Sequence, residues 1–390
     1  MEQIELAVPA LRQRPGTKWH RYPDDVLPAW VAEMDFAVAE PVQAAINQVV
    51  QLGGYGYEDP ATYEALANAF AEHMARRFGW SANPEWVVPV GDLLQALYGA
   101  VLAYSAPGEG VVLQTPIYPP FLAAVTETSR RVVESPLIEA GGRLAVDGAG
   151  LRRAAEAGAR VLLFCNPHNP TGRVFERDEL LAVSQAAVEY DLVVVSDEIH
   201  ADLVYPGRHH IPLATLGPDI AARTVTITSA TKGFNIPGLR CGVMHFGSAE
   251  LLGRLQAHFP QRLLGKANVL GVAATVAAWR EGEQWLGAVM RRLLDNRAYV
   301  GGFLGDRLPE IGYHPPEGTY FAWLDCRPLA LLDAPDQFFL DRARVALSDG
   351  RAFGPPGDGH VRLNFATSPA ILEEILERMA RAIRATAPRA

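Results

Sequence analysis

The central part of the chain contains four short, almost continuously apolar runs, separated by segments with helical periodicity. The runs cover residues 109–116, 160–167, 191–198 and 223–229. The segments 92–105 and 176–190 between them repeat apolar residues at intervals of three and four, as a helix with one buried face does. Strands that are apolar throughout are buried on both faces. The alternation therefore predicts a three-layer α/β/α domain with a mainly parallel sheet.

The last hundred residues follow a different pattern. A long helical stretch at 283–304 precedes a β-like run at 318–326, a helix around 335–347, a second β-like run at 360–366 and a final helix at 369–385. This order predicts a smaller α+β domain over residues 286–390, beside a large domain over residues 51–285. We expect the N-terminal residues 1–50 to pack on the small domain.

Charge and cysteine content restrict the class of protein. A formal net charge of −9 argues against nucleic acid or an anionic membrane as the main partner. The three cysteines, Cys165, Cys241 and Cys326, form no C-x-x-C pair and indicate reduced thiols. No apolar run approaches the ~18 residues of a spanning helix, and no signal peptide is evident, so we expect a cytoplasmic protein.

Polar clusters follow three of the apolar runs. They are NPHNPTG at 166–172, SDEIH at 196–200 and SATKG at 229–233. Ligands of open α/β sheets bind beyond the carboxyl ends of the strands. The three clusters therefore predict one shared crevice. No metal site is expected, because His209, His210 and Cys165 lack ligand spacing.

A phosphate site is one possibility in this crevice. Gly91 is followed by a helix whose first N–H groups, at Asp92 and Leu93, are free to bind an anion. Ser229 offers a hydroxyl and Arg240 a guanidinium. The alternative is an ordinary helix start with Asp92 as the N-cap, whose carboxylate would have to point away from a phosphate.

Four further side chains fit a planar heterocycle with a carbonyl group. Asp197 ends an apolar strand and could pair with a protonated ring nitrogen, or else form an N-cap or a structural ion pair. Asn169 could donate to a phenolate-like oxygen, and the Tyr118 ring could stack on the ligand or simply pack. Lys232, among other cations, could attack a carbonyl. Together with the phosphate site, these groups predict pyridoxal 5′-phosphate.

The chain resembles the fold-type I pyridoxal-phosphate aminotransferase family (class I/II), and within it the cystathionine β-lyase, or C–S lyase, subgroup. The resemblance covers nearly the whole length. It rests on the segments WVAEMDF (30–36), GYGYEDP (54–60), TPIYPPF (115–121), CNPHNPTGRVF (165–175), SDEIHADLVYPGRHHIP (196–212), SATKGFNIPGLRCG (229–242), GTYFAWLDCR (318–327) and VRLNFA (361–366).

The resemblance implies a role for each cofactor residue. Lys232 would bind the cofactor's aldehyde and later carry the substrate proton, Asp197 would pair with the ring nitrogen, and Asn169 would bind the ring 3′-oxygen. Tyr118 would stack on the ring. The phosphate would be held by Ser229, Arg240, Gly91 and the backbone of Asp92 and Leu93.

The remaining implied roles concern the substrate and a second subunit. Arg362 would bind the substrate's α-carboxylate, and the region of Ala32 would line the same pocket. Tyr57 matches a tyrosine that reaches the phosphate of the partner subunit's cofactor. The resemblance therefore implies a homodimer with shared active sites.

His200, three residues after Asp197, favours one reaction within the family. Many of the family's transaminases have a tyrosine there, whereas histidine resembles the C–S lyases. We therefore predict β-elimination of cysteine S-conjugates, such as cystathionine, to a thiol, pyruvate and ammonia. The alternatives are an aminotransferase and a cofactor-binding protein with a regulatory partner. Glu33, where the subgroup more usually has aspartate, and Ser348-Asp349 depart from the expected pattern.

Overall fold

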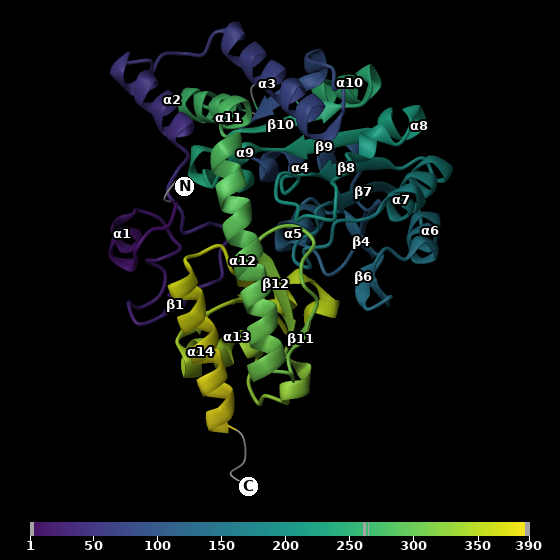
Figure 1. The fold of residues 1–390 in the computed structure, drawn as a ribbon. Coiled ribbons are helices and arrows are strands. Elements are labelled where there is room, and N and C mark those ends of the chain that lie inside the picture. The colour runs from purple at the N-terminus through teal and green to yellow at the C-terminus, as the bar shows by residue number, and fades with distance from the viewer. Residues whose placement is uncertain (1–3, 260–262, 264, 387–390) are drawn as a thin grey trace.

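The large sheet of the computed structural model has seven strands, in the order β2-β10-β9-β8-β7-β3-β4 (Figure 1). The structure describes residues 4–259, 263 and 265–386. The strands are β2 (Val87–Val90), β3 (Gly110–Leu113), β4 (Arg131–Glu134), β7 (Ala159–Cys165), β8 (Val193–Asp197), β9 (Thr224–Thr228) and β10 (Gly242–Phe246). Among the described strands of this sheet, β10 runs in the opposite direction to the rest, and the other neighbouring pairs are parallel. The prediction of a mainly parallel sheet is confirmed.

Helices cover both faces of this sheet, because alternate strand residues point to opposite sides. Val161 and Leu163 of β7 belong to one core with α4 (Leu93–Tyr104), α5 (Pro119–Thr126) and α10 (Ala249–His258). Leu162 and Phe164 belong to a second core with α6 (Gly148–Glu156), α7 (Arg177–Glu189) and α8 (Pro218–Ala221). The three-layer prediction is therefore confirmed.

A second, antiparallel sheet lies in the C-terminal part of the chain. Its strands, in the order β11-β12-β15-β14, are β11 (Gly312–Tyr313), β12 (Phe321–Asp325), β15 (His360–Asn364) and β14 (Ser348–Asp349). Its helices are α12 (Glu283–Arg307), α13 (Pro335–Phe338) and α14 (Pro369–Thr386). The helix expected over residues 335–347 is wrong beyond Ala343. Arg344 takes a left-handed conformation (φ 54°), and β13 (Val345–Ala346) then pairs with β1 (Leu27–Pro28).

The N-terminal residues contact both parts of the molecule. The β1–β13 pair fixes residues 27–28 to the C-terminal part, whereas α2 (Glu40–Gln51) packs on α11 (Val269–Glu281). α12 continues without a break through the boundary expected at residue 285, so the division into domains stays a prediction. The remaining elements are α1 (Val8–Gln13), α3 (Pro60–Phe78), α9 (Ala230–Gly233), β5 (Ile138–Ala140) and β6 (Arg143–Ala145). Within the described residues, no helix has the length and apolarity needed to cross a membrane.

Candidate functional site

The three polar clusters lie at one edge of the large sheet. β7, β8 and β9 are parallel neighbours, and the loop 166–172, Asp197 and α9 follow directly at their carboxyl ends. The antiparallel C-terminal sheet adds Arg362 from β15, whose Nη1 donates to Asn169 Oδ1 at 2.9 Å. The structure therefore brings Lys232, Asp197, Asn169 and Arg362 into one crevice.

Lys232 lies on α9, which begins at Ser229 as its N-cap. Its Nζ donates to the backbone oxygen of Ala32 at 3.0 Å. Burial and the charge of Arg362 lower the pKa of Lys232 to about 8, although Glu33 and Asp197 act in the opposite direction. About one tenth of this amine is thus neutral, and nucleophilic, at pH 7.

Asp197 is a buried carboxylate without a counter-ion. Only 8% of it is exposed, and its Oδ1 accepts from the Ile199 N–H at 3.0 Å. Among the described residues no cation forms an ion pair with it. Burial raises the pKa of Asp197 to about 7. A protonated ring nitrogen would supply the missing charge, so this residue fits pyridoxal phosphate, and the structural ion-pair alternative is wrong.

Arg362 is buried and held on three sides. Its Nη2 donates to the backbone oxygen of Trp30 at 2.9 Å and to Ser348 Oγ at 3.1 Å. Its guanidinium carbon lies 4.2 Å from the centre of the Phe321 ring. Burial lowers its pKa to about 10, so the group stays charged at neutral pH. The buried Nε has no hydrogen-bond partner, which suits a carboxylate ligand.

Asn169 keeps its amide N–H donors for a ligand. Because its Oδ1 accepts from Arg362, its amide N–H groups remain available. This polarity is the one that an oxygen of a phenolate type requires. The predicted role of Asn169 therefore agrees with the chemistry of its surroundings.

Tyr118 and His200 border the same crevice. Tyr118 is half-buried before α5, and burial raises its pKa, an effect that the charge of Arg362 opposes. His200 is buried with its ring centre 6.0 Å from that of Tyr320 and 5.6 Å from that of Phe321. Burial and the positive charges of Lys232 and Arg362 lower the pKa of His200 to about 3, so its imidazole is neutral.

The proposed phosphate site contains an ion pair between its own members. Asp92 is the N-cap of α4 and accepts from the Gln95 N–H at 2.9 Å, as the alternative reading stated. Its second oxygen pairs with Arg240. In the described chain the N–H groups of Asp92 and Leu93 have no acceptor. Ser229 Oγ donates to the Cys241 backbone oxygen at 2.5 Å. A phosphate would compete with Asp92 for Arg240.

Tyr57 is not brought to the site within one chain. It precedes α3 and its side chain is fully exposed. Its role at a partner's cofactor stays a prediction.

The sequence did not reveal several contacts that hold the site together. The backbone oxygen of Ala32 also accepts from the Tyr320 hydroxyl at 3.1 Å, and Ser348 donates to the Trp30 oxygen at 2.7 Å. Backbone acceptors have no side-chain signature, so composition cannot reveal them. Ser348 was noted only as a departure from the expected pattern.

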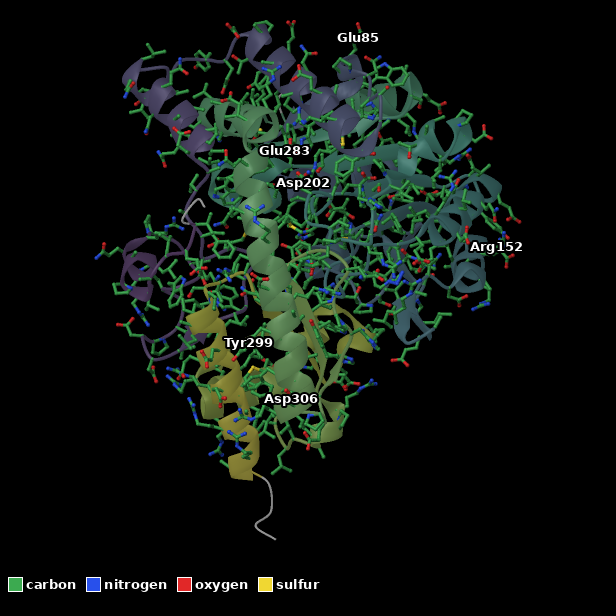
Figure 2. The ribbon with its side chains drawn as sticks, viewed as in Figure 1. Glu85, Arg152, Asp202, Glu283, Tyr299 and Asp306 are labelled. Carbon is green, nitrogen blue, oxygen red and sulfur yellow. The ribbon has the colours of Figure 1, made fainter. Side chains whose placement is uncertain are left out.

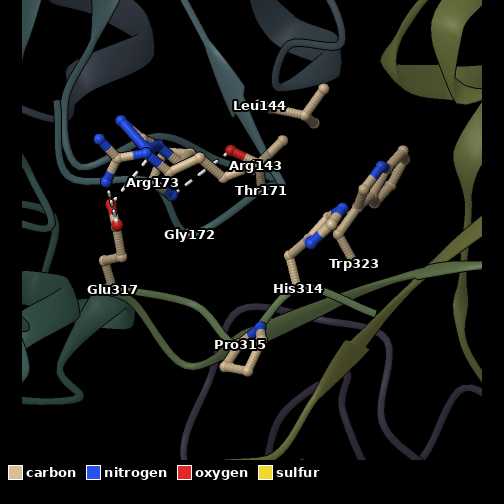
Figure 3. Close-up of a pocket in the computed structure, with 9 residues that line it drawn as sticks. All are labelled: Arg143, Leu144, Thr171, Gly172, Arg173, His314, Pro315, Glu317 and Trp323. Atoms are coloured by element: carbon tan, nitrogen blue, oxygen red, sulfur yellow. Dashed lines mark hydrogen bonds and ion pairs between the residues drawn. The ribbon is translucent and has the colours of Figure 1, made fainter. Parts of the chain in front are cut away.

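A small cavity lies beside the loop that carries Asn169, and none of the predicted site residues lines it (Figure 3). It has a volume of about 40 Å³, and Glu317 in its wall pairs with Arg143 at 3.1 Å and Arg173 at 3.4 Å. The backbone N–H of Glu317 also donates to Gly172 at 2.8 Å. The cluster thus fixes the loop that carries Asn169 to the segment before β12. The described residues contain no group of His, Cys, Asp and Glu that could hold a metal.

Comparison with known proteins gives consistent relatives. Residues 24–379 match the family described as aminotransferase class I and II. The Bacillus subtilis protein named cystathionine beta-lyase PatB is 34% identical, with 92% of this chain and 93% of that protein covered. The crystal structure of OvoB has a TM-score of 0.93 at 36% identity and covers 100% of both chains. The PLP-bound C–S lyase from Staphylococcus hominis has a TM-score of 0.89 at 30% identity, with coverage of 96% and 97%.

Proposed function

Because the chain belongs to the aminotransferase class I and II family, we propose that it is a pyridoxal-phosphate-dependent C–S β-lyase. Its substrates in this proposal are cysteine S-conjugates, and its products are a thiol, pyruvate and ammonia. The names of the relatives support C–S lyase chemistry. The observation that carries the proposal is the half-buried Lys232 amine, with a pKa of about 8, beside Arg362 and the uncompensated Asp197.

When bound, pyridoxal phosphate supplies an aldehyde for the substrate's amino group and a ring that withdraws electrons from Cα. Asp197 would keep the ring nitrogen protonated, because a positive charge beside the buried Asp197 carboxylate offsets the free-energy cost of burying that carboxylate. Asn169 would donate an amide N–H to the ring oxygen. The neutral His200 and the half-buried Tyr118 would enclose the ring.

Arg362 and Lys232 would act on the substrate itself. Arg362, charged and fixed by Asn169, Trp30 and Ser348, would bind the α-carboxylate. This contact would orient the Cα–H bond toward the Lys232 amine, which would accept the proton. Loss of the thiolate from Cβ and addition of water would then give pyruvate and ammonia. If Lys232 returned the proton to another carbon without loss of the thiolate, the reaction would be a transamination, so the fate of this proton separates the two reactions.

Product analysis without a keto acid tests the proposal. Purified protein with pyridoxal phosphate and L-cystathionine should release pyruvate and free thiol in equal amounts. Lys232→Ala should abolish both products. Product formation only when 2-oxoglutarate or pyruvate is added would identify an aminotransferase and contradict the lyase reaction. A partner pull-down that survives Lys232→Ala, without either product, would favour a regulatory role.

We also propose a homodimer with shared sites. Apolar side chains around Tyr57 are exposed in one chain: Leu52 by 77% and Tyr55 by 63%. A subunit with Lys232→Ala and one with Tyr57→Phe would each be impaired, but mixing them forms heterodimers with one unmutated site. Recovered activity on mixing supports the shared site. An active monomer in sedimentation would contradict it.

A further inference from the structure

A groove of about 650 Å³ lies between the N-terminal segment, α2 and the loop after α9. Glu33 lines it, together with Arg14, Lys18, Asp35 and Asn235. The residue before Glu33 is Ala32, whose backbone oxygen accepts from Lys232 Nζ at 3.0 Å. A residue in the wall of the groove and the residue that accepts from the Lys232 amine are therefore neighbours in the chain.

The backbone of Glu33 is fixed on both sides. Its carbonyl oxygen accepts from Lys18 Nζ at 2.9 Å and from Asn364 Nδ2 at 2.7 Å. The N–H of the following Met34 donates to Asn235 Oδ1 at 2.8 Å. These hydrogen bonds fix the position of the Glu33 Cα and Cβ atoms relative to the residues around Lys232.

The carboxylate of Glu33 has no partner within the described residues, although the side chain is half-buried. The two cationic side chains that line the groove, Lys18 and Arg14, bind other groups than the Glu33 carboxylate. Lys18 pairs with Asp35 at 3.0 Å, and Arg14 Nη1 donates to the Phe36 oxygen at 2.9 Å. A carboxylate that no cation of the protein neutralises is available to pair with a positively charged ligand.

The charge of Glu33 reaches the groups of the crevice. Burial and Arg362 lower the pKa of Lys232, and Glu33 acts against them. Burial and Glu33 both raise the pKa of the Tyr320 hydroxyl, while Arg362 lowers it. Tyr320 and Lys232 donate to the same Ala32 oxygen. The Glu33 carboxylate therefore lies close enough to the crevice for its charge to act on the reacting amine.

We propose that Glu33 is a specificity-determining residue that binds a positively charged group on the sulfur substituent of the substrate. The inference rests on the proposed function. Arg362 takes the α-carboxylate and the cofactor takes the α-amino group, so the substituent on Cβ is the part left to be recognised. Lys232 must reach the Cα proton, which places that substituent near the amine and within reach of the groove. The preferred substrates are cysteine S-conjugates whose leaving thiol has an ammonium or another cationic nitrogen.

Two substrates of equal size test this assignment in the holoenzyme. S-(2-aminoethyl)-L-cysteine ends in an ammonium, and S-propyl-L-cysteine ends in a methyl group at the same position. The unsubstituted protein should show the higher kcat/KM for the aminoethyl substrate. Glu33→Gln should lower the ratio of the two kcat/KM values by about tenfold, the order expected for a hydrogen bond to a charged group. Glu33→Asp keeps the charge and should retain part of the preference. Glu310→Gln, at an exposed position, is the matched control.

A binding measurement without turnover gives a second readout. L-lysine and L-2-aminoheptanoic acid have the same two ends as these substrates but no leaving group. Their dissociation constants, from absorbance titration of the bound cofactor, should differ in the unsubstituted protein and converge in Glu33→Gln. Pyruvate release with an unchanged ratio, or an equal fall for both substrates, would overturn the role of Glu33 while leaving the lyase intact. No pyruvate from either substrate would overturn both.

Discussion

Substitution of Asp197 by asparagine should change stability in opposite directions with and without the cofactor. In the cofactor-free protein, Asp197 is a buried acid with its pKa raised from 3.8 to about 7. Such a group is protonated in the folded chain at pH values where it is already charged in the unfolded chain. Its contribution to stability is therefore full below the unfolded pKa and is lost as the pH rises through the folded pKa.

The size of the loss follows from the two pKa values. A shift of about three units corresponds to about 4 kcal/mol, of which about 1.5 kcal/mol is lost by pH 5 and the rest by pH 8. Asparagine does not titrate. The free energy of unfolding of the cofactor-free Asp197→Asn variant, relative to the unsubstituted protein, should thus rise by about 2–3 kcal/mol between pH 5 and pH 8.

Urea unfolding of both cofactor-free proteins at the two pH values measures this difference. Asp306→Asn is the control, because Asp306 lies exposed near the end of α12 (Figure 2). In the holoprotein, the same substitution should lower stability. Without the Asp197 carboxylate, the protonated ring nitrogen loses its counter-ion, so the affinity for the cofactor should fall by about 100-fold or more. A cofactor-free variant whose stability relative to the unsubstituted protein is the same at both pH values would refute the reasoning.

Three further predictions concern the residues around this acid. The rate at which the cofactor-free protein takes up the cofactor can be followed by stopped-flow absorbance. This rate should increase as the pH rises through about 8, because Lys232 loses its proton there, and should then level off. A rate that continues to increase beyond pH 10 would contradict this assignment. Ser348→Ala should raise KM several-fold with little change in kcat, because Arg362 loses one of its acceptors; an equal fall in kcat would contradict it. Gly172→Ala should lower the free energy of unfolding by about 2 kcal/mol or more, because φ is +68° and the new Cβ would lie 2.3 Å from Pro316 Cβ. Gly207→Ala, at φ +90° with open space around it, should cost less in the same urea titration.

The large sheet was predictable because its strands are buried on both faces. Short, largely apolar runs such as 191–198 are typical of strands that are buried on both faces of a sheet. Asn169, Asp197 and Lys232 each lie at or just after the carboxyl end of a parallel strand. Their proximity could therefore be predicted from the general position of ligands in α/β sheets, before any contact was known. The sequence pattern gave a wrong prediction where pairing between distant segments decides the structure. Val345 and Ala346 leave the expected helix because they pair with Leu27 and Pro28, more than 300 residues earlier.

The inner contacts of the site could not be predicted for a similar reason. Ala32 and Trp30 act through backbone oxygens, which every residue has. The pairing of Asp92 with Arg240 depends on the fold, since 148 residues separate them. Sequence showed which side chains have suitable chemistry. Structure was needed to show which of them form no ion pair, as is true of Asp197 and Glu33 among the described residues.

Borohydride reduction of the purified protein after reconstitution with pyridoxal phosphate tests the function of Lys232 most directly. Peptide mass spectrometry should find one reduced cofactor adduct per chain, attached to Lys232, and Lys232→Ala should have none. A protein that binds no cofactor, or an adduct on another lysine with Lys232 unmodified, would contradict the assignment of this amine and the reaction built on it.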